Sequence, residues 1–224
     1  SPRSSRSTSS PGAPNTRPVA MLTTEHDLGV TWTVDDEGMA RSWHVVALEG
    51  DVWIIDPVDC AGTIEAATSR GTVRGVIQLL DRHQRSNRAI ADQLGVPHHR
   101  LPDELPDTPF TVETPLDKPG WRERALWIAG RRALIVAEVV GAGPQYLVGP
   151  GRVGVHPMLR LKPPGRLSRF ADAEHLLMGH GPPLSGPDAG TELVAALDRT
   201  RRDIVRMPAA MLRMPKPFRR GRLD

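Results

Sequence analysis

The segment Met178-Gly179-His180-Gly181-Pro182-Pro183 places one histidine between two glycines, directly after an apolar run over residues 173–178. Glycine adopts backbone conformations, and allows close approaches of the main chain, that other residues forbid. The pattern therefore predicts that the imidazole of His180 is held at the end of a strand and faces a cleft. A proline-rich loop follows it.

Three other segments carry polar residues where a strand is expected to end. They are Asp81-Arg82-His83-Gln84-Arg85-Ser86, Thr114-Pro115-Leu116-Asp117 and Ala137-Glu138. The first follows an apolar run, residues 76–80, and precedes a helix expected to have Ser86 as its N-cap and Gly95 as its C-cap. This order of strand, polar loop and helix is typical of α/β proteins, which place their sites at the carboxyl ends of strands.

The rest of the pattern indicates two halves, each with a β-hairpin followed by a helix. The expected strands are residues 30–34, 43–48, 52–56, 76–80, 110–113, 125–129, 133–137 and 175–178, and the expected helices are 63–69, 86–94, 166–173 and 190–205. Residues 144–164 are rich in glycine and proline and are expected to form a long loop, and His98-His99 is expected in a solvated turn. The predicted fold class is α/β, with an αββα sandwich.

The chain has 224 residues and a net charge of +3, but the positive charge lies at its ends. We expect residues 1–20 to be a disordered basic segment, residues 21–206 to be one domain, and residues 207–224 to be a basic, mostly disordered tail. The region between the tails is acidic overall, which argues against a basic globular face. The C-terminal tail alone is a candidate contact for nucleic acid or an anionic membrane.

Two further features limit the class of protein. No apolar stretch approaches the roughly 18 residues of a transmembrane helix, and no apolar signal region starts the sequence, so a cytoplasmic location is expected. Cys60 is the only cysteine, which excludes an internal disulfide and a cysteine-based zinc cluster. We interpret Cys60 as a small packing residue rather than a nucleophile.

Over roughly residues 28–205, these segments and their order resemble the metallo-β-lactamase fold superfamily, which includes glyoxalase II-like hydrolases. Residues 50–56 resemble its second hairpin, and residues 76–96 resemble its strand, metal loop and helix. Residues 114–120 are similar to its Thr-Pro-Gly-His-Thr-Pro-Gly loop, and residues 125–140 to the hairpin that ends in Gly-Asp. The segment Gly179-His180-Gly181-Pro182-Pro183 matches its terminal Gly-His-Gly-Pro-Pro, which is the most specific of these likenesses.

The resemblance also locates the positions that would hold two metal ions, and most of them are altered. The His-x-His-x-Asp-His loop of the superfamily falls on Asp81, His83, Arg85 and Ser86 in that order. The later ligand positions fall on Asp117, on Glu138 for the bridging aspartate, and on His180. The candidate metal ligands are therefore Asp81, His83, Asp117, Glu138 and His180, of which only the two histidines are retained as written.

Arg85 is the substitution with the clearest chemical consequence. A guanidinium stays protonated and has no lone pair for a metal, so Arg85 places a cation where the second metal would lie. We therefore expect a cleft salt bridge of Arg85 with Glu138 and Asp117, with Arg82 as a further cation, in place of a dinuclear centre. Asp56 is expected to accept hydrogen bonds from backbone N–H groups near the cleft.

These positions leave three interpretations open. The first, which we favour, is a protein of this fold that is non-catalytic or binds a small molecule in the cleft, with no metal cofactor. The second is a hydrolase of an ester, thioester or phosphoester that uses one zinc, manganese or iron ion on Asp81, His83, Asp117 and Glu138. The third is an interaction module that binds nucleic acid or an anionic membrane through its basic tail.

Overall fold

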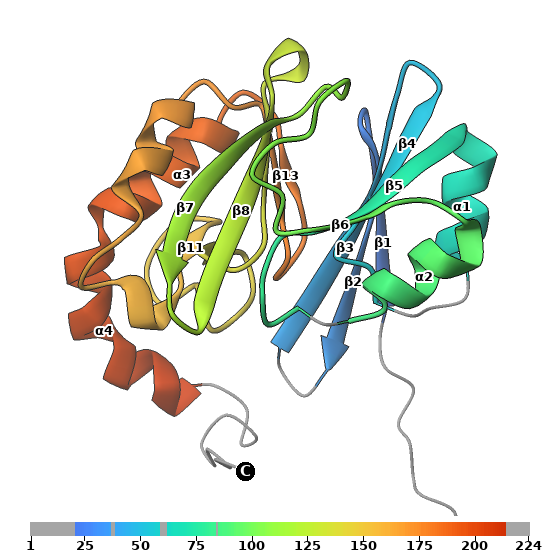
Figure 1. The fold of residues 1–224 in the computed structure, drawn as a ribbon. Coiled ribbons are helices and arrows are strands. Elements are labelled where there is room, and N and C mark those ends of the chain that lie inside the picture. The colour runs from blue at the N-terminus through green and yellow to red at the C-terminus, as the bar shows by residue number, and fades with distance from the viewer. Residues whose placement is uncertain (1–20, 37–38, 59–61, 84, 214–224) are drawn as a thin grey trace, which may run out of the picture.

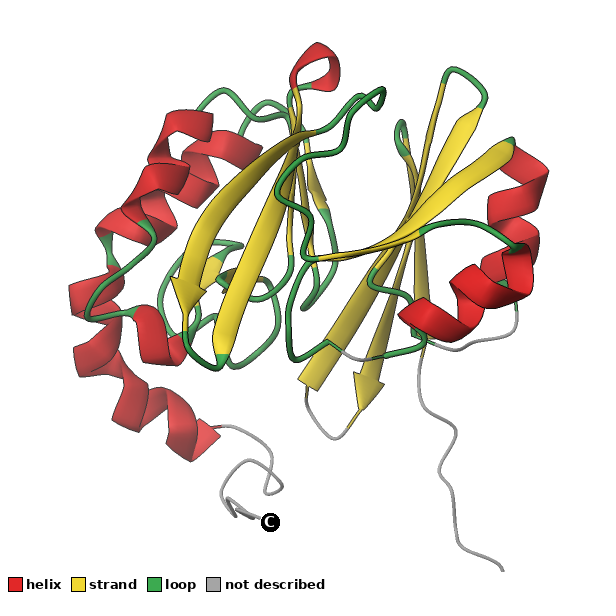
Figure 2. Cartoon of the chain, viewed as in Figure 1, coloured by secondary structure: helices red, strands yellow, loops and turns green. Residues whose placement is uncertain are grey.

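Two β-sheets face each other, and the helices lie on their outer faces (Figure 1; Figure 2). The structure is a computed structural model that describes residues 21–36, 39–58, 62–83 and 85–213. Cys60 and both ends of the chain lie outside these ranges. The layers confirm the predicted αββα sandwich.

The first sheet has the strand order β1-β2-β3-β4-β5-β6. Its strands are β1 (Met21–His26), β2 (Gly29–Asp36), β3 (Met39–Leu48), β4 (Asp51–Ile55), β5 (Thr72–Gln78) and β6 (His98–Arg100). The strands β1 to β4 pair antiparallel, whereas β5 is parallel to both of its neighbours. The crossovers to β5 and β6 contain the helices α1 (Thr63–Arg70) and α2 (Asn87–Leu94), which cover the outer face (Figure 1).

The second sheet has the order β13-β12-β9-β8-β7. Its strands are β7 (Thr111–Lys118), β8 (Trp121–Ile128), β9 (Ala133–Val136), β12 (His175–Met178) and β13 (Leu184–Ser185). The helices α3 (Ala189–Asp198) and α4 (Thr200–Arg213) lie outside it (Figure 1). Between β9 and β12 lie a small strand pair, β10 (Val140–Gly141) with β11 (Gly154–Val155), and the 3-10 helices η2 (Pro157–Leu159) and η3 (Gly165–Phe170); η1 (Ala129–Arg131) links β8 to β9.

Alternation of side chains along the strands builds two apolar cores. On β4, Trp53 and Ile55 lie in the core between the sheets, whereas Val52 and Ile54 lie in the core beneath α1 and α2. Successive residues of a strand point to opposite faces, so a strand covered on both sides is apolar throughout. This explains why residues 52–55 read as a continuous apolar run.

Several predicted elements differ from the observed ones. Residues 114–117 were expected in a loop but belong to β7; this is an edge strand, where a proline is tolerated, and its register shifts between Glu113 and Leu116, around Pro115. His98-His99 lies in β6 rather than in a turn. The expected helix 190–205 is two helices, and α4 continues to Arg213, beyond the predicted start of the tail.

The capping predictions for α2 have two outcomes. Gly95 ends the helix in the left-handed conformation, with φ of 66°, and its N–H donates to the carbonyls of Ala91 and Asp92, as predicted. Ser86 is the N-cap residue, as predicted, and its carbonyl accepts the Ile90 N–H at 3.0 Å, but its side chain makes no capping hydrogen bond. The chain of Ser86 is held by its backbone instead, since its N–H donates to the Pro57 carbonyl at 3.0 Å.

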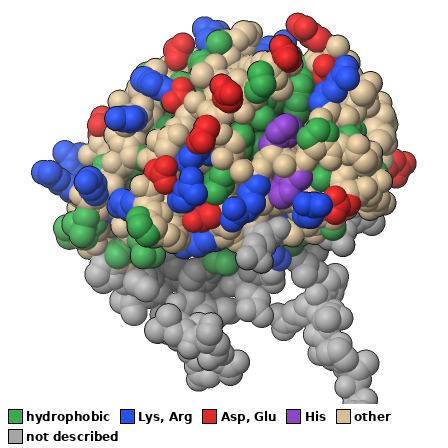
Figure 3. Space-filling model, in the orientation of Figure 1, with side chains coloured by type: hydrophobic (Ala, Val, Ile, Leu, Met, Phe, Trp, Pro, Cys, Tyr) green, Lys and Arg blue, Asp and Glu red, His purple; other side chains and the backbone are tan. Residues whose placement is uncertain are grey.

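Charges of both signs are interspersed over the face of the molecule seen in Figure 3. This face therefore offers no broad surface of one charge. Among the described residues, no helix is both long and apolar enough to cross a membrane.

Candidate functional site

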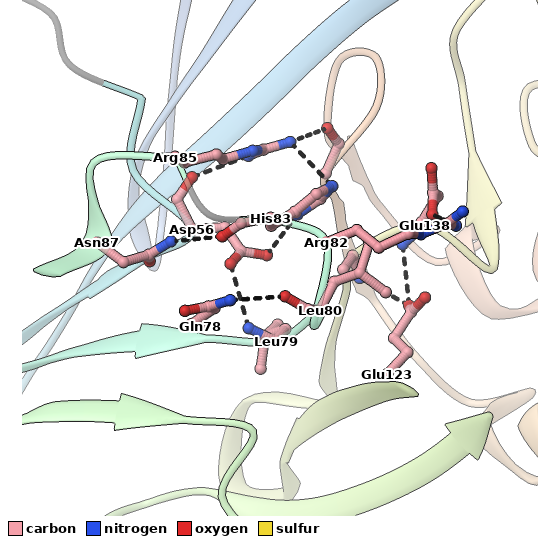
Figure 4. A network of polar contacts seen from close by, with 12 residues as sticks. Asp56, Gln78, Leu79, Leu80, Arg82, His83, Arg85, Asn87, Glu123 and Glu138 are labelled. Atoms are coloured by element: carbon pink, nitrogen blue, oxygen red, sulfur yellow. Dashed lines mark hydrogen bonds and ion pairs between the residues drawn. The ribbon is translucent and has the colours of Figure 1, made fainter. Parts of the chain in front are cut away.

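Two buried side chains, Asp56 and His83, anchor the site at the carboxyl ends of β4 and β5 (Figure 4). The Nδ1 atom of His83 lies 3.0 Å from Oδ2 of Asp56, and Oδ1 of Asp56 accepts the Leu79 N–H at 3.1 Å. The expected role of Asp56 as an acceptor of a backbone donor is confirmed. A carboxylate accepts hydrogen bonds, so the ring proton of His83 is on Nδ1 and its lone pair is on Nε2.

The guanidinium of Arg85 is held by backbone carbonyls from three parts of the fold. Its Nη1 atom donates to the carbonyls of Ser42 at 2.7 Å and Asp56 at 2.8 Å, and Nη2 donates to the Gly179 carbonyl at 3.4 Å. Nη2 also donates to Nε2 of His83 at 3.4 Å. The side chain therefore links β3 and the end of β4 with the end of β12, which belongs to the other sheet.

The electrostatics of this pair keep one charge on the arginine and none on the histidine. Burial, and next the charge of Arg85, lower the pKa of His83 below its ordinary value, although Asp56 opposes them. Burial also lowers the pKa of Arg85, yet a guanidinium remains protonated in proteins. The backbone of Arg85 has φ of 27°, a left-handed conformation that is unfavourable for a non-glycine residue.

Glu138 follows β9 and is the centre of a second cluster. Its Oε2 atom forms an ion pair with Nη2 of Arg82, whose guanidinium also lies 4.3 Å from the ring centre of Trp121. Its Oε1 atom lies 4.0 Å from Nε2 of His156 and 4.0 Å from Nε2 of His180, too far for direct hydrogen bonds. Glu138 therefore has one oxygen paired with Arg82 and one that faces two imidazoles.

His180 lies where the sequence predicted, directly after β12, and is only 5% exposed. The flanking glycines are needed because a Cβ on Gly179 would lie 2.4 Å from the Ala137 carbonyl oxygen, and Gly181 has φ of 89°. Burial, and next the charge of Arg85, lower the pKa of His180 to about 3, so the ring is neutral at neutral pH. Neither ring nitrogen has a hydrogen-bond partner within the described ranges.

Glu123 on β8 is a buried acid next to the site that the sequence analysis missed. Its Oε1 atom accepts the backbone N–H groups of Ala137 and Glu138 at 2.9 Å and of Val139 at 3.2 Å (Figure 4). The side chain is fully buried, and this burial raises its pKa to about 8 although the three N–H groups act in the opposite direction. Glu123 thus fixes the turn that carries Glu138. Its place in the charged run Trp121-Arg122-Glu123-Arg124 concealed it.

The ring neighbours of His180 were also missed, because they lie in the glycine- and proline-rich segment 144–164. The ring centre of Tyr146 lies 5.7 Å from that of His180 and 5.8 Å from that of His156. The Tyr146 hydroxyl donates to the Glu138 carbonyl at 3.0 Å. Nothing in the composition of this segment distinguishes these two side chains from loop residues.

The structure does not bring all the predicted site residues together. Asp117 is half exposed on β7, where it pairs with Arg122 at 3.1 Å and with Arg124 at 3.7 Å. Oδ2 of Asp81 accepts the backbone N–H of Arg122 at 3.0 Å. In the part of the chain that the structure describes, no group of three or more His, Cys, Asp or Glu side chains is arranged to hold a metal ion.

The ion pair of Glu138 is formed by Arg82 and not by Arg85, for which a salt bridge with Glu138 and Asp117 was expected. Arg82 pairs with Glu138, while Arg85 donates to carbonyl oxygens and to His83. In Figure 4, Arg82 lies between His83 and Glu138, whereas Arg85 lies beside Asp56 and His83. The physical reason is that Arg85 lies among buried backbone acceptors that need a donor, whereas Arg82 lies at the surface end of the loop.

Comparison with known proteins identifies the fold but gives no close relative. No protein-family model matches the sequence, and no curated protein matches it. Solved structures of metallo-β-lactamases do match in three dimensions. DIM-1 metallo-β-lactamase exposed to ceftazidime has a TM-score of 0.56 at 14% identity, over 88% of this chain and 100% of that one.

Two further structures agree. FIM-1 from Pseudomonas aeruginosa, in a mono-zinc form, has a TM-score of 0.56 at 13% identity, over 85% of this chain and 99% of that one. A metallo-β-lactamase from Hirschia baltica has a TM-score of 0.54 at 12% identity, over 81% and 98%. At such identities the likeness establishes a shared fold, which confirms the resemblance drawn from the motifs.

Proposed function

We propose that this chain, which has the metallo-β-lactamase fold, binds a small molecule at the site around His83, Glu138 and His180 without a metal ion, and does not catalyse hydrolysis. The fold implies a metal, and one of the similar structures is in a mono-zinc form. The residues at the corresponding positions of this chain do not fit one. The interaction of Arg85 with His83 carries the proposal.

His83 has no nitrogen left for a metal. Its Nδ1 donates to Asp56 and its Nε2 accepts from Arg85, so both ring nitrogens are in use. A metal ion at Nε2 would also lie against a guanidinium, and two cations a few ångströms apart in a poorly solvated site repel strongly. Arg85 is itself retained by carbonyls at 2.7 and 2.8 Å, so it cannot move away without leaving buried acceptors unpaired.

The carboxylates of the alternative, one-metal hydrolase are also unsuitable. A zinc ion requires three or four donors at about 2.0–2.3 Å. Asp117 and Asp81 are engaged with Arg122, so two of the four ligands that this alternative needs are already in use. A hydrolase that relies on metal-bound water would therefore lack both its metal and its nucleophile.

A ligand-binding role is supported by buried polar atoms near Glu138 that lack partners. Buried polar groups in folded proteins are almost always hydrogen-bonded. His180 is buried with two unpartnered nitrogens, and Nε1 of Trp121 is also unpartnered among the described residues. Such atoms gathered beside a half-exposed arginine are typical of a site that binds a polar molecule.

The test is the metal content of untagged protein, purified without chelator from cells grown with added zinc, manganese and iron. We expect well below one equivalent of any metal, and no turnover of ester, thioester or phosphoester substrates. The variant Arg85→Asp restores a carboxylate at the position where the superfamily has its loop aspartate, so it should retain more zinc than the wild type. Arg88→Asp, on the exposed face of α2, is the matched control.

Three results would contradict the proposal. Close to two equivalents of metal in the wild-type protein would mean that Arg85 leaves the site in solution. One equivalent, together with turnover that a chelator abolishes, would support the mononuclear hydrolase instead. Turnover that survives chelation, and is absent from an inactive control preparation, would mean that the site is catalytic without a metal.

A further inference from the structure

Arg82 is held in the way that a protein holds a bound organic cation. Its guanidinium lies 4.3 Å from the ring centre of Trp121 and forms an ion pair with Glu138. An aromatic face and a carboxylate are together the usual recognition elements for such a cation. The Arg82 side chain is 44% exposed, whereas that of Glu138 is only 17% exposed. The cation is therefore the accessible member of the pair.

Two histidines near Glu138 face its free oxygen without a direct hydrogen bond to it. Nδ1 of His156 accepts the Met158 N–H at 3.3 Å, so the proton of this neutral ring is on Nε2, which faces Oε1 of Glu138 at 4.0 Å. His180, 5% exposed, presents Nε2 to the same oxygen at 4.0 Å. Each gap exceeds a direct hydrogen bond. Both ring nitrogens of His180, and Nε1 of the Trp121 ring on which the guanidinium lies, are buried and have no partner among the described residues.

From this geometry we propose that Arg82 fills, from within the chain, a site for a small molecule with a guanidinium head, which binds by displacing the arginine from Glu138 and Trp121. The inference rests on the proposed function, because a metal ion in the cleft would occupy Glu138 and His180. It deepens that function by naming the chemical class of the ligand and the contact that regulates its access.

The charge and shape of the ligand's head group follow from the groups that Arg82 would leave without a partner, the Glu138 carboxylate and the Trp121 ring. Displacement by a neutral or anionic molecule would leave the mostly buried Glu138 carboxylate without a counter-charge, which is costly. A planar, delocalised cation stacks on an indole ring and donates to a carboxylate through two N–H groups, whereas an ammonium group is a strongly hydrated point charge. A substituted guanidinium therefore fits better than a primary ammonium of equal length.

While Arg82 occupies the site, a ligand cannot bind there. The apparent affinity for the ligand is therefore the affinity of the open site multiplied by the fraction of molecules in which the site is open. Arginine has a long flexible side chain, and the half-exposed Arg82 can swing into water without unfolding its loop. Removal of the Arg82 guanidinium should therefore raise affinity rather than lower it. A residue that serves only as a surface salt bridge would not have this effect.

The test is calorimetric titration of n-propylguanidinium, the analogue of the arginine side chain, into wild-type protein and Arg82→Ala. We expect the variant to bind at least about tenfold more tightly than the wild type, a factor that corresponds to a site open one-tenth of the time or less. Neutral n-propylurea should not bind, and n-propylammonium should bind more weakly. Arg88→Ala, which removes an exposed guanidinium paired with Asp92, is the matched control and should bind as the wild type does.

The double variant Arg82→Ala, Glu138→Gln should lose the gained affinity, with circular dichroism and thermal unfolding used to establish that it is folded. Three outcomes would overturn the inference: equal affinity in Arg82→Ala and wild type, equal binding of propylurea, or unchanged affinity in the folded double variant. The metal analysis above is independent of these titrations. If the protein is metal-free and does not bind propylguanidinium, this inference alone is wrong. If the protein is purified with bound metal, the proposed function is wrong as well.

Discussion

Replacement of Arg85 by alanine should destabilise the whole domain and not only the cleft. The guanidinium donates to the carbonyls of Ser42, Asp56 and Gly179, so its loss removes a link between the two sheets. A hydrogen bond to a charged group contributes about 1.5–3 kcal/mol, and such bonds within one network are not additive. Removal of one member of a buried charged network costs about 3–5 kcal/mol, which is the loss we expect in the free energy of unfolding.

The measurement is urea unfolding followed by circular dichroism, with the midpoint and the slope fitted separately. Because a small domain is stable by only about 5–15 kcal/mol, a loss of this size moves the midpoint well outside experimental error. Arg88→Ala removes an exposed pair with Asp92 and should cost about 0.5 kcal/mol or less. Arg85→Lys keeps the charge, but its single nitrogen cannot reproduce the fork, so its stability should lie between those of the wild type and the alanine variant.

The reasoning is refuted if Arg85→Ala unfolds within about 1 kcal/mol of the wild type, the range of an ordinary surface substitution. That outcome would mean that the carbonyls find water or other donors as readily as they find the guanidinium. A stable Arg85→Ala variant that also binds zinc would indicate a metal site held closed by the arginine alone.

Three further predictions concern other parts of the chain. Burial raises the pKa of Glu123 to about 8 in the folded protein, so as pH rises the unfolded chain loses this proton first. The free energy of unfolding should therefore fall between the ordinary glutamate pKa of 4.5 and about 8, by up to about 5 kcal/mol. Urea unfolding of Glu123→Gln at several pH values should show a flatter pH dependence than the wild type. Equal pH dependence in both proteins would assign the effect to other groups. Gly179→Ala should lower the free energy of unfolding by about 1–3 kcal/mol because the added Cβ meets the Ala137 carbonyl. Gly130→Ala should be nearly neutral, because nothing lies within 4 Å of a Cβ added there. Similar thermal midpoints for the two variants would contradict the close approach at Gly179. Removal of residues 214–224, which carry four Lys or Arg residues, should weaken any salt-dependent binding to DNA or anionic vesicles, and unchanged affinity would exclude the tail as the contact.

Much of the architecture follows from local patterns that depend on few neighbours. Residues 52–55 are apolar throughout because both faces of β4 are covered, and the glycines at 179 and 181 are required by the backbone around His180. These features are visible in the sequence because strand periodicity and glycine conformation are properties of the chain itself. β1 was missed because its six residues lie at the sheet edge and bury little, so its pattern is weak.

The pairing of charges was decided by the tertiary structure. Arg82 and Arg85 lie in the same loop, and no spacing rule says which of them reaches Glu138. Arg85, with its unusual φ, donates to carbonyls of β3 and of the ends of β4 and β12. Asp117 was assigned to the site by its place in a motif, but the register shift around Pro115 sets it opposite Arg122. Tyr146, His156 and Glu123 enter the site through contacts between segments far apart in the chain.

The sequence by itself determined that this chain folds as an αββα sandwich and that an arginine replaces an acidic residue in the polar loop after β5. Only the tertiary structure decided which groups that arginine contacts and that Glu138 pairs with Arg82. The physical reason is range: backbone periodicity and glycine conformation are set by adjacent residues, whereas hydrogen bonds and ion pairs of long side chains depend on where distant carbonyls and carboxylates come to lie once the two sheets have packed.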